Sequence, residues 1–142
     1  MDIARLAGQL GYPASEASMR ARLERILGSS NDVVFIAADS GGALLGWVHG
    51  FLSQLLESDR RVEIGGLVVD ERFHRKGIGR QLIRRIEDWA GEHSVLQISV
   101  RCRQSRTEAN AFYESLGFRA AKTQVAFRKT IDGAGLTARK KQ

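Results

Sequence analysis

The chain has few of the residues that would cross-link it or anchor it in a membrane. Its single cysteine, Cys102, excludes an internal disulfide. Cysteine and histidine are too sparse and too widely spaced for a zinc site, so we expect no metal. No apolar run approaches the roughly 20 residues that cross a bilayer, and an acidic start at Asp2 does not fit a secretory signal. These absences predict a cytoplasmic protein with no membrane partner.

The composition suits one globular domain. The chain has 142 residues, of which 43% are hydrophobic and 27% charged, a balance that excludes a disordered protein. It contains no internal repeat, low-complexity segment or linker. We therefore expect a single domain over residues 1–142, ending in a basic tail at about 132–142.

The charge is strongly positive, with a formal net charge of +6. Such a charge suits nucleic acid, an anionic membrane surface or a phosphorylated small ligand. No recognition helix, finger or aromatic-interleaved basic motif is present, so we expect no nucleic-acid partner. Much of the charge gathers around one glycine-rich turn, which favours the phosphorylated ligand. The residues are Arg72, Arg75, Lys76, Arg80, Arg84 and Arg85.

Hydrophobic periodicity predicts an α/β fold with a mixed sheet flanked by helices. A strand–helix–strand unit around Ile78–Trp89 implies a right-handed crossover between parallel strands. We expect a polar loop over 54–60 and a capping box formed by Ser105 and Glu108. Helices are predicted over 3–10, 15–27, 78–89 and 109–116, and strands over 32–38, 43–52, 62–69 and 95–100, with one bent or two short strands over 118–131.

One segment carries the pattern of a phosphate-binding turn. A strand ends near Val69, the chain turns through residues 75–80, and a helix begins. Backbone N–H groups at such a turn have no helical partner, and the helix dipole adds positive charge. The segment is neither a Walker A loop nor a Rossmann fingerprint, because it lacks GK[ST] and a third glycine. An ordinary glycine-rich loop with solvated charges is the alternative.

Two motifs resemble signatures of the GNAT superfamily of N-acetyltransferases. Residues 74–79 are similar to the family's [RQ]-x-x-G-x-[GA] loop, with His74 in place of Arg or Gln. Residues 109–118 are similar to its A-x-x-[FY]-Y-x-x-x-G-F signature, and Arg106 stands where an Asn often precedes it. The likeness runs from about Val33 to Lys129. It implies that acetyl-CoA is the co-substrate and that its acetyl group passes directly to a primary amine.

The resemblance also implies how acetyl-CoA would be held. Its pantetheine arm would enter between splayed fourth and fifth strands, next to a bulge at Gly65-Gly66. A backbone N–H near Leu67 would polarise the acetyl carbonyl. The implied cofactor-binding residues are Leu67, Val68, Val69, His74, Arg75, Lys76, Gly77, Ile78, Gly79, Arg80, Arg106 and Phe112.

Two residues are candidates for proton transfer. The resemblance makes Tyr113 the general acid for the departing thiolate, since phenol and thiol have nearby reference pKa values of about 10 and 8.5. It could instead be only a core aromatic of its helix. Glu63 shares a strand face with Gly65 and is the candidate base. It could also be a surface carboxylate paired with Arg60 or Arg61, leaving His49 or water as the base.

Other features leave alternatives open. A non-catalytic acyl-CoA-binding module on the same scaffold would need the loop but neither acid nor base. The family's fold opens with a strand for which Met1 and Asp2 leave no room. We therefore expect the chain to lack this first strand, which leaves the strand over 32–38 as an edge. Either that edge is covered by the first helix or by a second chain in a homodimer, or the natural start lies upstream. The sequence does not identify the amine.

Overall fold

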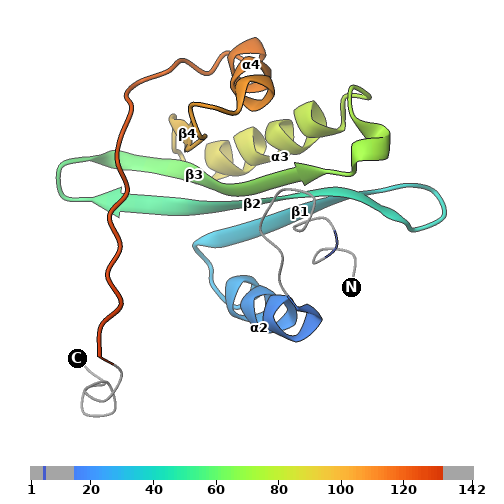
Figure 1. Ribbon diagram of the computed structural model, residues 1–142, viewed down its shortest axis with the longest axis horizontal. Coiled ribbons are helices and arrows are strands. Elements are labelled where there is room, and N and C mark those ends of the chain that lie inside the picture. The colour runs from blue at the N-terminus through green and yellow to red at the C-terminus, as the bar shows by residue number, and fades with distance from the viewer. Residues whose placement is uncertain (1–4, 6–14, 133–142) are drawn as a thin grey trace.

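The computed structural model describes Arg5 and residues 15–132 as a four-stranded sheet with helices on both faces (Figure 1). The expected mixed α/β fold is confirmed. In chain order the elements are α2 (Glu16–Leu27), β1 (Asp32–Ala38), β2 (Leu44–Leu55), β3 (Ser58–Val69), the short 3-10 helix η1 (Glu71–Phe73), α3 (Ile78–Glu92), β4 (Ile98–Val100) and α4 (Thr107–Ser115). Apart from Arg5, the helix predicted over 3–10 lies outside the described residues, as does the tail beyond Asp132.

The sheet has the order β1-β2-β3-β4. Its first three strands are antiparallel and β4 is parallel to β3, as the strand–helix–strand pattern predicted. His49 pairs with Gly66 and Gly50 with Ile64, so Gly65 is the extra residue of a β-bulge, which confirms the prediction from the paired glycines. Pairing of β3 with β4 ends at Ile64, five residues before β3 itself ends.

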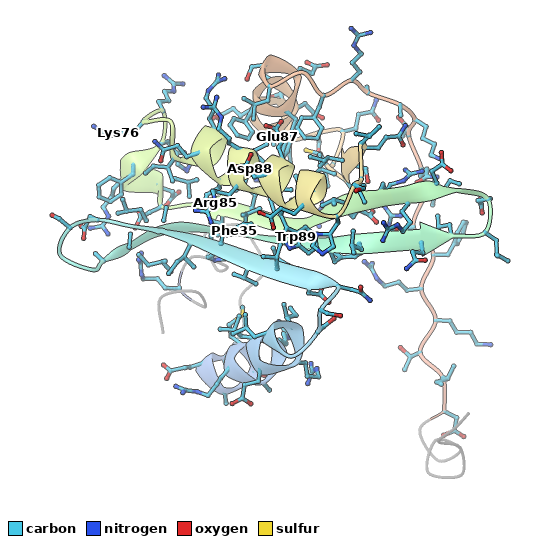
Figure 2. The ribbon with its side chains drawn as sticks, turned by 180° about the vertical axis from the view of Figure 1, so that it is seen from behind. Phe35, Lys76, Arg85, Glu87, Asp88 and Trp89 are labelled. Carbon is cyan, nitrogen blue, oxygen red and sulfur yellow. The ribbon has the colours of Figure 1, made fainter. Side chains whose placement is uncertain are left out.

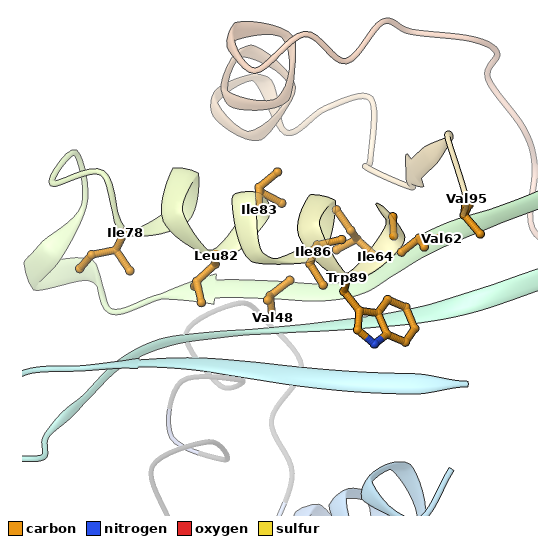
Figure 3. Packing of buried hydrophobic residues seen from close by; sticks show 10 residues of the cluster. Val48, Val62, Ile64, Ile78, Leu82, Ile83, Ile86, Trp89 and Val95 are labelled. Atoms are coloured by element: carbon orange, nitrogen blue, oxygen red, sulfur yellow. The ribbon is translucent and has the colours of Figure 1, made fainter. Parts of the chain in front are cut away.

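The core lies between the sheet and α3 (Figure 3). Helical spacing along α3 places Leu82, Ile86 and Trp89 on one face. They pack against Val48 and residues of β3, and Val48 and Ile86 are fully buried. On the other face of the sheet, α2 packs against β1. No helix within the described ranges combines the length and apolarity needed to cross a bilayer.

One further contact ties α3 to the first strand of the sheet. The guanidinium of Arg85 lies over the ring of Phe35, 4.6 Å from its centroid (Figure 2). Phe35 belongs to β1, the edge strand farthest from β4. α3 therefore contacts the three antiparallel strands, β1, β2 and β3.

Three local predictions, concerning a loop, a helix cap and the length of a strand, were wrong. The expected polar loop over 54–60 is instead a tight turn at Leu56-Glu57, because β2 and β3 keep pairing as far as Leu55 and Ser58. The predicted capping box does not form, since Arg106 is the N-cap of α4 and makes no side-chain capping bond. The strand predicted over 95–100 is shortened to β4, Ile98–Val100.

The strands predicted over 118–131 were also wrong. Residues 119–132, here called the C-terminal arm, are exposed and form no helix or strand. Figure 1 shows the arm running past the ends of β3 and β2 and away from the sheet. Val125, Phe127 and Ile131 are 76%, 91% and 59% exposed. Their alternation is typical of a strand, but a strand also needs a hydrogen-bonded neighbour, and no described strand pairs with the arm.

Candidate functional site

The turn from β3 into α3 presents backbone N–H groups at the start of a helix. Gly77 is the N-cap of α3, and the first turn carries no side-chain cap and no acidic residue. Gly77 has φ +80°, in the left-handed region that glycine adopts without strain. Arg75, Lys76 and Arg80 are exposed around it. Unsatisfied N–H groups, the helix dipole and these cations together fit a diphosphate group such as that of CoA.

The residue that departs from the family pattern points away from this turn. His74 Nε2 lies 2.9 Å from the carbonyl oxygen of Val69, at the end of β3. The ring therefore braces the turn against the strand. Backbone groups are left as the main donors to a ligand here, which is consistent with the substitution of Arg or Gln by His.

Asp70 fixes the chain immediately after β3. Its carboxylate is 1% exposed and accepts hydrogen bonds from the backbone N–H and the guanidinium of Arg72 and from Arg5 Nη1, at 3.1, 3.0 and 3.0 Å. The bonds from Arg72, with that from Arg5, hold the pKa of Asp70 well below its usual value. Asp70 thus stays ionised and anchors η1. Asp70 was not among the predicted site residues.

The two family-like motifs meet in the structure. A Cβ atom added to Gly79 would lie 2.9 Å from Cζ of Phe112, a distance too short for two carbons. A Cβ on Gly77 would meet nothing within 4 Å. Gly77 therefore leaves the turn open toward solvent, whereas Gly79 allows α3 to pack closely on α4. The family resemblance had implied that both glycines belong to the cofactor-binding residues.

The divergence of β3 from β4 opens a hollow on the face of the sheet that carries α2. Beyond Ile64, the backbone of Leu67, Val68 and Val69 has no strand beside it on the β4 side. The hollow has a volume of about 1130 Å³. Its walls come from α2, β1, β2, β3, the chain after β4, α4 and the C-terminal arm. An open strand edge beside such a space suits an extended ligand that pairs with the backbone.

Tyr113 lines this hollow from α4. Its ring packs edge-on against Phe112 and Phe118, with centroids 5.2 and 5.5 Å away. Burial, with a smaller effect of Cys102, raises the pKa of Tyr113 to about 12, and Arg106 opposes the rise. Both interpretations of Tyr113 therefore have support, since the ring belongs to the aromatic packing while the residue lines the hollow. The phenol stays protonated at neutral pH and is available as a donor.

The two candidate bases have different surroundings. His49 lines the hollow, and its Nε2 lies 2.8 Å from Asp32 Oδ1. A Cβ on Gly65 would lie 2.7 Å from His49 Nδ1, so the bulge leaves room for the ring. Glu63 is 16% exposed at its side chain, and its Oε1 lies 3.4 Å from Arg101 Nε rather than from the Arg60 or Arg61 considered above.

Asp32 is a site residue that sequence reasoning missed. It lies 17 residues from His49, and nothing in the local pattern links the two. The register of β1 against β2, in which Val34 faces His49, brings Asp32 next to the ring. Among the described residues no cluster of three or more His, Cys, Asp or Glu side chains could hold a metal ion.

Comparison with known sequences places the chain in a family. Residues 3–118 match the Acetyltransferase (GNAT) family. This segment is most of the chain and contains the loop, the bulge and Tyr113. The chain therefore belongs to the GNAT acetyltransferase family, as the two motifs had indicated.

Individual relatives are similar over part of the chain. N-acetylaspartate synthetase of Rattus norvegicus is 38% identical over 63 residues, 44% of this chain and 21% of that protein. [Ribosomal protein bS18]-alanine N-acetyltransferase of Escherichia coli K12 is 34% identical over 67 residues, 47% and 45% of the two chains. The chain thus spans less than half the length of these curated relatives.

A solved structure confirms the fold over a longer stretch. AAC(6')-Iy in complex with the bisubstrate analog CoA-S-monomethyl-acetylneamine superposes with a TM-score of 0.79. The match covers 90% of this chain and 89% of that one, at 21% identity. At this identity the likeness concerns the fold, and the substrates of that protein are not transferred to this chain.

Proposed function

We propose that this chain is an acetyl-CoA-dependent N-acetyltransferase that works as a single domain and acetylates a primary amine. The observation that supports it most is the continuity of three features. The uncapped start of α3 follows β3 in the chain after η1, and the free edge of β3 and the phenol of Tyr113 border one hollow. In acetyl-CoA, the diphosphate would bind at the start of α3, the pantetheine arm along the free edge of β3, and the thioester next to the phenol.

In this proposal the backbone of residues 74–80 binds the diphosphate and the exposed cations Arg75, Lys76 and Arg80 neutralise it. Leu67, Val68 and Val69 donate and accept backbone hydrogen bonds along the pantetheine arm. The backbone N–H near Leu67 polarises the acetyl carbonyl. Arg106 and Phe112, at the start and on the inner side of α4, complete the cofactor side. When bound, acetyl-CoA supplies the activated acetyl group.

Tyr113 acts on the leaving thiolate. Because its pKa is raised to about 12, full proton transfer to the departing thiolate, whose conjugate thiol has a reference pKa of about 8.5, is uphill. The phenol therefore stabilises the developing negative charge on sulfur mainly by donating a hydrogen bond. Such a donor is effective in a partly buried site, where water competes weakly.

The incoming ammonium must lose a proton before it attacks. We propose Glu63 as the base, acting through water, since it lies on β3 close to the bulge. His49 is a second candidate that a specific contact favours. Asp32 accepts the proton of His49 Nε2 at 2.8 Å, which leaves Nδ1 of the neutral ring as an acceptor toward Gly65.

We further propose a cytoplasmic homodimer. β1 is an edge strand of the described sheet, and its Ile36 is 58% exposed. The C-terminal arm presents three exposed apolar side chains of its own. Exposed apolar residues along an unpaired edge or an extended arm are suited to contact with a second copy.

Release of free thiol from acetyl-CoA, followed with a panel of primary amines, tests the proposed activity. We expect thiol to appear only when a suitable amine is present, together with the N-acetylated amine in the mass spectrum. If acetyl-CoA raises the melting temperature but no amine releases thiol, the chain would instead be an acyl-CoA-binding module. Thermal stabilisation by the ligand separates that case from a protein that does not bind acetyl-CoA.

A further inference from the structure

We propose that the acceptor amine carries a carboxylate or phosphate group, so that the substrate is anionic rather than polycationic. The proposal rests on the N-acetyltransferase activity proposed above and names the class of amine that the hollow admits. It follows from the charges on the walls of the hollow. Arginines are in surplus on these walls, and no acidic residue is found among the described residues that line them.

Five arginines from separate parts of the fold line the hollow. They are Arg22 of α2, Arg101 and Arg103 after β4, Arg106 at the start of α4, and Arg128 of the arm. No Asp, Glu or Lys is among the described residues that line it. Segments far apart in the sequence thus each contribute arginine side chains to the walls of this hollow.

Nearby carboxylates offset only part of this charge. Glu63 is paired with Arg101 at 3.4 Å, and Asp32 with His49 at 2.8 Å. Arg22, Arg103 and Arg128 form no ion pair with any described residue. Three guanidinium groups are therefore available even if Arg106 serves the cofactor.

The phosphates of acetyl-CoA do not account for these arginines. The diphosphate would lie at the turn before α3, where Arg75, Lys76 and Arg80 are exposed. None of the residues 74–80 lines the hollow. The chain thus has two separate groups of cations, one at the turn and one around the acceptor space.

Guanidinium groups suit carboxylate and phosphate for geometric reasons. Their planar N–H donors form paired hydrogen bonds with both anions. A hollow bordered by one sign of charge also concentrates ligands of opposite sign and repels those of the same sign. Trp47, His49 and Tyr113 lie among the lining residues and would contact the uncharged part and the amine. The hollow therefore disfavours polyamines and aminoglycosides.

Paired amines test the proposal directly. Thiol release from acetyl-CoA is measured with glucosamine 6-phosphate against glucosamine, and with β-alanine against β-alaninamide. Kanamycin and spermidine represent polycations. We expect the anionic member of at least one pair to have a kcat/KM at least about tenfold higher than its partner, with the advantage shrinking as salt is added. The pair that responds distinguishes phosphate from carboxylate. A preference for kanamycin, spermidine or the uncharged partners would overturn the proposal.

Two substitutions on the same helix provide a matched control. Arg22→Gln and Arg25→Gln remove the same charge from α2, but only Arg22 lines the hollow. Loss of a charge-assisted hydrogen bond should raise KM for the preferred anionic amine by about 10-fold to 100-fold in Arg22→Gln, and likewise in Arg103→Gln. In the Arg25→Gln variant, KM for the same amine should stay at the wild-type value. In all three variants, acetyl-CoA should raise the melting temperature as much as it does in the wild-type protein. Equal effects of Arg22→Gln and Arg25→Gln would mean that only overall charge matters, against the proposal.

Binding measurements separate this proposal from the proposed activity. If no amine releases thiol, titration of glucose 6-phosphate and of N-acetyl-β-alanine into the protein with CoA present still reports on the hollow. Binding of either anion that weakens in Arg22→Gln would support the anion site while the activity failed. No binding of either anion, or tighter, steeply salt-dependent binding of random-sequence RNA, would overturn it.

Discussion

At the scale of single residues, Tyr113 allows the clearest test of catalysis. Tyr113→Phe removes one hydroxyl and keeps the ring that packs against Phe112 and Phe118. If the phenol donates to the leaving thiolate, kcat should fall by roughly 100-fold while acetyl-CoA still raises the melting temperature. Steady-state kinetics and thermal shifts on the same preparations measure both. An unchanged kcat would reduce Tyr113 to a packing residue.

The identity of the base is a second question at this scale. Glu63→Gln and His49→Gln each replace a titrating group by an amide of similar size. If Glu63 is the base, only Glu63→Gln should remove or shift the acidic limb of the profile of kcat/KM against pH. If only His49→Gln moves this limb, His49 is the base. Asp32→Asn should then resemble His49→Gln in part, because the imidazole would lose the carboxylate that orients it. A limb that neither variant moves would point to unassisted attack.

Single residues also show where sequence-based prediction ended. Tyr113, the glycines of the turn and the bulge at Gly65 could be located because each belongs to a local pattern. Asp32 could not, since its contact with His49 depends on strand register. Asp70 contacts the distant Arg5 but also its near neighbour Arg72, so only part of its role depends on the fold. Of the five arginines that line the hollow, only Arg106 was among the predicted site residues, for the same reason. They come from four segments that only the folded chain brings together.

At the scale of elements, the start of α3 can be tested by a pair of isosteric substitutions at Gly77. Asn and Asp both tolerate the left-handed conformation better than other side chains, so Gly77→Asn and Gly77→Asp should be similarly strained. Only Asp places a negative charge where the diphosphate would bind. We expect Gly77→Asn to keep much of the thermal shift by acetyl-CoA, and Gly77→Asp to lose it.

Equal shifts in both folded variants would place the cofactor elsewhere. Gly79 is a poor position for this test. Its missing side chain accommodates Phe112, so any substitution there would disturb helix packing as well as binding.

The predictions for α3 and β1 matched the structure, whereas those for the β2–β3 turn and the C-terminal arm did not. α3 has a clear apolar face, and β1 is rich in β-branched residues. The β2–β3 hairpin was longer than expected because its polar ends are held by backbone pairing, which the side-chain pattern does not report. The C-terminal arm has the alternation of a strand, but whether a strand forms depends on a partner that sequence does not name.

At the scale of the whole molecule, the proposed homodimer can be located by three substitutions. Light scattering at micromolar concentration should give twice the mass of the chain. Ile36→Lys tests β1, Phe127→Lys tests the arm, and Leu56→Lys, at a fully exposed turn residue, is the control. We expect the control to remain dimeric and one of the other two to become monomeric. A wild-type monomer in which the amides of β1 exchange no faster than those of β3 would exclude the dimer.

The contact between Gly79 and Phe112 limits how the chain can be recombined with its relatives. The glycine lies in the motif before β4 and the ring in the motif after it, yet the ring fills the space that a side chain at position 79 would need. A chimera that imports α3 with alanine at position 79 would place a methyl carbon 2.9 Å from the ring, unless the imported segment extended through α4. Crossovers within residues 93–106 should therefore fail more often when the donor carries alanine there, and a smaller side chain at 112 should rescue them. Positions 79 and 112 should therefore be exchanged together.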